Sequence, residues 1–278
     1  MRNEGTRLFV SMAAARALQS VCHQNNRGGS LYKQGRCIEA LRSLKETVKT
    51  SKTFLKECLE QVEGTTAFDL CISLQVLPSR TVQAQEDHSF LDPSVYSKPF
   101  EIEMTLLGNG KASLGEQVIQ GEPCVLFSTL SPILIFNFAL AYHTLALTSR
   151  DDDDTGRRSF LSRARDLYCL AYTTLQGERQ LREELLDPAL LHFLVQAILN
   201  NLSQCYASLD DTENSTKCCK LLLKSILLFQ HRRHHPRSST REAESHDDRN
   251  SWNDESTALF WKNTLFLILK DPGFAPAA

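Results

Sequence analysis

The spacing of apolar residues predicts a mostly helical chain. Between residues 31 and 63, apolar side chains recur three and four positions apart, at Ile38, Leu41, Leu44 and Val48. This is the period of a helix with one buried face. The same period recurs over residues 159–176, 188–209 and 215–229. Residues 8–22 also form a helical pattern, and we expect the polar stretch at 25–30, which contains two glycines, to end that helix.

The segment 132–149 is apolar nearly all round, so we expect it to be the most buried helix. Ser131 and Pro132 form a good helix start, because proline is favoured in the first turn. The acidic run at 151–154 lacks the spacing of a calcium-binding loop and predicts a solvated surface loop.

The apolar period changes to two between residues 67 and 130, which is typical of strands. Alternating apolar positions predict one strand that ends at Pro78 and a second around residues 96–104. Residues 124–130 are a candidate third strand. This region is therefore a small β-like or irregular insertion in a helical protein.

Beyond residue 230 the chain first becomes polar and then apolar again. Residues 231–255 contain almost no apolar side chain, which indicates a linker too polar to fold alone. A last apolar helix follows. The pattern divides the chain into N-terminal helices with a first helix pair (1–66), the insertion (67–130), further helix pairs (131–230), the polar linker (231–255), and a C-terminal capping helix with its tail (256–278).

Three windows of the chain resemble tetratricopeptide (TPR) repeats, in which small residues sit where two helices of a pair cross. The clearest window places small and large residues at the family's spacing, at Gly28, Leu31, Gly35, Ala40 and Leu44. The second carries Asn137, Phe138, Ala139 and Tyr142, then Ala164, Tyr168 and Ala171. The third carries Asn201, Leu202, Ser203 and Tyr206, then Ser215, Cys219 and Leu222.

The resemblance implies an α-solenoid of helix-turn-helix pairs, broken by the β-like insertion, that acts as a protein-interaction scaffold. It also implies a peptide groove lined by the first helix of each pair. The candidate groove residues are Lys33, His143, Asn200, Gln204 and Ser208. They are not the lysine and asparagine set that captures a C-terminal carboxylate. The expected partner is a protein or peptide.

Composition narrows the function classes. A net charge of −2 argues against a nucleic-acid partner, which usually requires a basic stripe. No fully apolar run of about 18 residues indicates a membrane span. Nine cysteines without regular spacing favour a reducing compartment, cytoplasmic or nuclear. The N-terminus loosely resembles a targeting peptide, but Glu4 and Ser11 favour an ordinary helix.

We find no pattern of residues that predicts catalysis, a cofactor or a metal. Cys218 and Cys219 are adjacent, which suits zinc poorly even with His231, His234 and His235 nearby. The stretch at 108–115 lacks the spacing of a phosphate-binding loop. Two alternatives to a scaffold remain: a structural subunit of a larger helical assembly, and an enzyme with a site near residues 67–130.

Overall fold

The described part of the chain is mostly helical, with a small sheet. The computed structural model describes residues 6–10, 12–60, 70–78, 95–108, 123–149, 154–177, 186–234 and 260. Along the chain the elements are β1 (Thr6–Val10), α1 (Met12–Lys33), α2 (Cys37–Glu60), β2 (Leu70–Pro78), β3 (Phe100–Gly108), α3 (Pro123–Thr148), α4 (Asp154–Gly177), α6 (Pro188–Ser208) and α7 (Thr212–His234).

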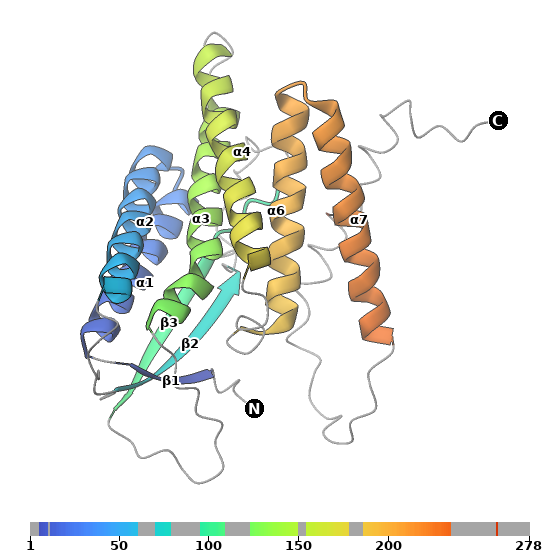
Figure 1. The fold of residues 1–278 in the computed structure, drawn as a ribbon. Coiled ribbons are helices and arrows are strands. Elements are labelled where there is room, and N and C mark those ends of the chain that lie inside the picture. The colour runs from blue at the N-terminus through green and yellow to red at the C-terminus, as the bar shows by residue number, and fades with distance from the viewer. Residues whose placement is uncertain are drawn as a thin grey trace, which may run out of the picture.

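The helices pack against one another in chain order. α1 packs on α2, α2 on α3, α3 on α4, α4 on α6, and α6 on α7. Figure 1 shows them standing side by side from α1 to α7, with the strands near the lower ends of α1 and α3. Helices that are neighbours in sequence are therefore also neighbours in space, and α1 additionally packs on β3.

Helix α1 runs without a break through the stretch at 25–30, where we expected it to end. Gly28 is needed there because a Cβ at this position would lie 2.6 Å from Cγ of Leu44 on α2. The helix ends at Lys33, and the turn that follows places Gly35 at a φ of 73°, which suits glycine. Gly35 N donates to Tyr32 O, and Arg36 N donates to Leu31 O, which together satisfy the last carbonyls of the helix.

The sheet is antiparallel with the order β1-β2-β3. The expected strand that ends at Pro78 is confirmed as β2. Of the strand expected over residues 96–104, only the part from Phe100 is a strand, and β3 continues to Gly108. Thr6–Val10, by contrast, forms a strand, although we expected a helix from residue 8. Leu8 pairs with Ile72 of β2, so a partner distant in sequence decides the conformation of this short segment.

The expected strand at 124–130 is instead the first part of α3. A short apolar run fits a buried strand or a buried helix equally well by periodicity. Helix α3 begins at Pro123, so Pro132 lies inside it and does not start it. The Ser131 hydroxyl donates to the Phe127 carbonyl oxygen at 2.7 Å in the same turn.

Helix α3 has the length and composition of a membrane span over Leu126–Thr148, with a mean hydropathy of 1.5. In the structure 83% of that window is buried. The contacts of α3 with α2 and α4 cover this surface, so burial inside the protein accounts for its apolar composition.

The C-terminal part of the chain is described only in small part. The first four residues of the expected linker, 231–234, continue α7, and the rest of that linker lies outside the described residues. Of the expected capping helix only Phe260 is described, and its side chain is buried.

We expect Gly28→Ala to destabilise the protein and Gly29→Ala to stabilise it. The added methyl at residue 28 overlaps Leu44, which is itself buried, so we expect a net loss of about 1 kcal/mol or more after the helix-propensity gain. At residue 29 the nearest atom is 3.5 Å away on Pro99, and we expect a gain of about 0.5–1 kcal/mol. Urea unfolding of both variants measures this difference. Equal effects at the two positions would contradict close packing at Gly28.

Candidate functional site

An extended part of the chain, residues 95–104, lies against helices α1, α3 and α6. We call it the inner segment. Its second half is the start of β3. On each of the three helices, one asparagine binds both the N–H and the C=O of a single residue of this segment.

The three contacts have the same geometry. Asn26 Oδ1 accepts from the Ile102 N–H at 2.9 Å, and its Nδ2 donates to the Ile102 carbonyl at 2.8 Å. Asn137 makes the same pair of bonds to Phe100, at 2.8 and 2.7 Å. Asn201 makes them to Tyr96, at 2.8 and 2.9 Å. The inner segment therefore crosses the helices in the order α6, α3, α1.

Two further asparagines hold these three in place. Asn25 Oδ1 accepts from Asn137 Nδ2 at 2.9 Å, and Asn25 Nδ2 donates to the Phe100 carbonyl at 3.0 Å. Asn200 Nδ2 donates to Asn201 Oδ1 at 3.1 Å. The set Asn25, Asn26, Asn137, Asn200 and Asn201 is called the asparagine face below. All of its members except Asn26 are fully buried.

The asparagine face takes the place of a neighbouring strand. Successive residues of a strand direct their N–H and C=O to opposite edges, so Phe100 and Ile102 share one edge. The other edge of β3 pairs with β2, where Glu101 lies opposite Leu77. The asparagines thus satisfy the backbone groups of an edge beside which the described residues place no strand, in an interior where unpaired groups are costly.

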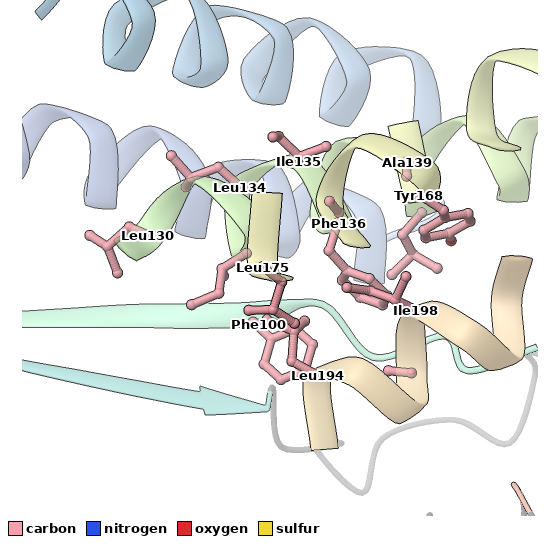
Figure 2. Close-up of a cluster of buried hydrophobic side chains, with 14 of the residues drawn as sticks. Phe100, Leu130, Leu134, Ile135, Phe136, Ala139, Tyr168, Leu175, Leu194 and Ile198 are labelled. Carbon is pink, nitrogen blue, oxygen red and sulfur yellow. The ribbon is translucent and has the colours of Figure 1, made fainter. Parts of the chain in front are cut away.

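The side chains of the same residues anchor the inner segment in the core. Tyr96, Phe100 and Ile102 are each at most 2% exposed. The Phe100 ring meets Phe136 of α3 edge-on at 5.3 Å between centroids, and Phe193 of α6 at 6.0 Å. Figure 2 shows Phe100 among side chains of α3, α4 and α6, near Leu175 and Leu194. One aromatic ring therefore links several helices.

Burial decides where charged side chains lie in this region and how the pKa of a buried tyrosine shifts. At the rim of the asparagine face, Lys33 Nζ donates to Glu101 Oε1 at 2.6 Å, and both side chains are about one third exposed (32% and 33%). Deeper in, the Tyr168 hydroxyl accepts from Asn201 Nδ2 at 3.0 Å, and burial raises the pKa of Tyr168 well above its usual value. The interior contacts are thus neutral, and charge is confined to the rim.

The five residues expected to line a groove lie in different surroundings. Lys33 contacts the inner segment through Glu101, and Asn200 belongs to the asparagine face. His143 is buried, with its Nδ1 3.7 Å from the Cys205 sulfur. Gln204 is half-buried and Ser208 is exposed. The structure brings Lys33 and Asn200 to the inner segment, and whether any of the five contacts a partner stays a prediction.

Sequence reasoning missed the roles of Asn26, Asn137 and Asn201 in binding a backbone. The sequence did contain a signal for this role. Each asparagine lies two positions before a small residue of the repeat resemblance, namely Gly28, Ala139 and Ser203. An amide at the same place in three apolar helix faces is costly unless it is hydrogen-bonded. The pattern therefore indicates that the three asparagines share one hydrogen-bonding role.

Six cysteines are unpaired and mostly buried; they are Cys22, Cys37, Cys169, Cys205, Cys218 and Cys219. Burial raises the pKa of Cys22 and of Cys218 to about 12. Within the described ranges no three His, Cys, Asp or Glu side chains are placed to hold a metal ion. Cys218 and Cys219 pack inside as small apolar groups.

Neither family models nor curated proteins nor solved structures give a match to this chain. The geometry of its own residues therefore carries the functional argument.

We expect Cys22 to react with iodoacetamide at pH 8 far more slowly than half-buried Cys169. The thiolate is the reactive form, and a pKa of about 12 lowers its population by roughly a thousandfold relative to a free thiol. Mass spectrometry of each cysteine peptide after timed labelling measures the two rates. Labelling in urea should abolish the difference, whereas equal rates in the native protein would contradict the burial of Cys22.

We expect Asn137→Ala to lower the free energy of unfolding by about 2–4 kcal/mol, because it removes the partner of the buried Phe100 N–H and one partner of its C=O. Asn137→Asp keeps the size but loses the donor. Buried against a carbonyl, the new carboxyl has a raised folded-state pKa. Its protonated form restores a donor, so the deficit relative to wild type should shrink as the pH falls from 7 to 5.

Urea unfolding of both Asn137 variants at pH 7 and pH 5 measures these effects. The matched control is Asn214→Ala at the start of α7, where Asn214 Nδ2 donates to Asp211 near the surface. We expect this control to change the free energy of unfolding by less than about 0.5 kcal/mol. Similar losses at residues 137 and 214 would contradict the role of the asparagine face.

Proposed function

We propose that this protein is a non-catalytic protein-interaction scaffold built from TPR-like helix pairs. The observation that carries the proposal is that one asparagine from each of three helices binds both backbone groups of one residue in an extended segment. Such contacts hold a polypeptide through groups that every non-proline residue has, largely independent of its side chains.

The helix pairing supports the TPR-like part of the proposal. The three windows of the resemblance fall on α1 with α2, α3 with α4, and α6 with α7, and each of these pairs is packed together. Gly28 lies directly beneath Leu44, and Gly35 forms the turn between the first two helices. Small residues at a crossing let two helix backbones approach, which is the physical basis of the repeat pattern.

The chemistry of the asparagine face suits binding better than catalysis. Its groups are neutral amides, which donate and accept hydrogen bonds but neither transfer protons near pH 7 nor act as nucleophiles. Lys33 and Glu101 at its rim neutralise each other. We therefore propose a protein or peptide partner, and no cofactor or nucleic acid. With free thiols in its core, we place the scaffold in the cytoplasm or nucleus.

A second candidate function is a structural subunit of a larger helical assembly. It is favoured by α7, the last helix whose bounds the structure describes, on which Leu221, Leu227 and Leu228 are 44–50% exposed. Apolar side chains grouped at the end of an array are a common place for a neighbouring subunit to pack.

The experiment is to purify the tagged full-length chain from its own cells and to determine the stoichiometry of any complex by size-exclusion chromatography with light scattering. We expect a monomer when the chain is purified alone after recombinant expression, and a complex of fixed stoichiometry with a protein partner from cells. Self-assembly of the recombinant chain would favour the subunit function. A chain that turns over a small molecule and forms no stoichiometric protein complex would overturn both.

A further inference from the structure

We propose that the exposed face of α2 is a docking surface for an acidic amphipathic helix of a partner protein. This inference rests on the scaffold function proposed above and goes beyond it, because it names the surface and the chemistry of the partner. The face consists of two neighbouring rows of side chains, which we call the cationic row and the apolar row. The cationic row is Arg42, Lys45, Lys49, Lys52 and Lys56, and the apolar row is Leu41, Val48 and Leu55.

The cationic row runs along most of α2. All five of its side chains are exposed, and they follow one another three or four positions apart, so they lie along one side of the helix. At a rise of about 1.5 Å per residue, the row is about 20 Å long. Ile38, which is 58% exposed, lies four positions before Arg42 and adds an apolar side chain at the end of the row.

The cationic row is unfavourable for the helix that carries it. Each of its members has another cation three or four positions away, and like charges at that spacing repel each other. Lys45 and Lys52 form no ion pair with any described residue, and Lys49 lies 3.9 Å from Glu46 between two exposed side chains. A helix face that meets only solvent is stabilised by alternating signs. The unbroken positive row therefore indicates a ligand with negative charge.

The apolar row shows which kind of negative ligand fits. Leu41, Val48 and Leu55 follow one another at intervals of seven residues and are half-buried, so they pack on the core and also reach the surface. Lys45 and Lys52 come four positions after Leu41 and Val48, which places the two rows next to each other. A repeat of seven is the spacing at which two helices pack side by side. A partner helix with one apolar line and acids beside it matches both rows.

The surroundings of the cationic row favour a protein over nucleic acid or a lipid surface. Single-stranded nucleic acid is bound by stacking its bases on aromatic side chains, and the cationic row contains none. Glu39 and Glu46 lie three positions before and four positions after Arg42, so they border the row and repel phosphate groups. Insertion into a lipid surface requires an apolar face that reaches the lipid, whereas the apolar row is half-buried against the core.

The test uses the full-length chain and a synthetic peptide of defined chemistry. The probe is a fluorescein-labelled peptide of about three heptads, with leucine every seven residues, glutamate three and four residues from each leucine, and alanine elsewhere. A second peptide has the same composition in scrambled order. We expect saturable binding of the first peptide by fluorescence anisotropy, weakened by added salt. The scrambled peptide should bind about tenfold more weakly or worse, because its acids and leucines do not share one face.

The decisive variant reverses two charges of the cationic row, Lys45→Glu together with Lys52→Glu. Each new carboxylate lies four positions before another lysine of the row, which is the favourable order along a helix. We therefore expect a melting temperature at or above that of the wild type, together with peptide binding weakened about tenfold or more. The matched control is Lys217→Glu together with Lys224→Glu on exposed positions of α7, with the same spacing and the same change in net charge. It should change binding by less than about twofold.

Equal binding of the two peptides, or equal loss in the α7 control, would overturn the proposal, since net charge alone would then explain the binding. Tighter binding of single-stranded oligouridine or of vesicles containing phosphatidylserine, lost in the α2 variant, would also overturn it and assign the cationic row to nucleic acid or lipid.

The fate of the complex from cells separates this inference from the scaffold function. A stoichiometric protein complex that survives the α2 double variant would overturn the inference and leave the scaffold function standing, with the partner on another surface. Conversely, binding of the ordered peptide without any protein complex from cells would support the α2 surface and count against the scaffold.

Discussion

The structure depends on the hydrogen bonds made by one buried edge of β3, whose backbone N–H and C=O groups need partners. Within the described residues β3 pairs with a strand, β2, along one side only, and its other side faces helices whose own backbone groups are already paired within each helix. A peptide N–H or C=O left unpaired inside a protein costs about 1–3 kcal/mol. Asparagine resolves this because its amide presents one donor and one acceptor at a separation that matches the N–H and C=O of a single residue. Aspartate lacks the donor, and glutamine adds a rotatable bond.

This solution fixes the positions of three helices relative to one segment. Asn26, Asn137 and Asn201 are far apart in sequence. Each can bind the inner segment only if its helix is positioned so that the asparagine lies beside its partner residue in the segment. The connections among the asparagines make the arrangement cooperative, since Asn25 bridges Asn137 and the Phe100 carbonyl. The aromatic ring of Phe100 then fills the space between α3 and α6 that this geometry creates. The same residues of the inner segment thus form the buried backbone hydrogen bonds and fill the apolar core.

Much of the helical fold could be predicted from the sequence, because amphipathic helices such as α2 carry a local 3.6-residue period. The failures have physical causes. Gly28 and Gly29 suggested a helix end. Instead, Gly28 lets α1 pack closely against Leu44 of α2, and this tertiary contact cannot be read from the local sequence. The first turns of α3 gave no period because α3 is buried nearly all round. β1 is short, and its partner lies about sixty residues away in sequence. The candidate site was predictable as three recurring asparagines, but its occupant was not, since nothing local links residues 95–104 to those helices.

The neutrality of the asparagine face connects this geometry to function. A charged clamp would select a terminus or a charged side chain, whereas neutral amides bind an extended backbone whatever its side chains are. Here the side chains of that backbone pack on aromatic rings at Tyr96 and Phe100, and Glu101 pairs with Lys33. The chain itself supplies this segment, so the face never exposes its five amides and aromatic surface to water. Without the inner segment these amides would lack their hydrogen-bond partners, and the exposed groups would become sites of non-specific strand pairing. The inner segment therefore stabilises the fold twice, by satisfying the buried amides and by filling the space between the helices with Tyr96 and Phe100.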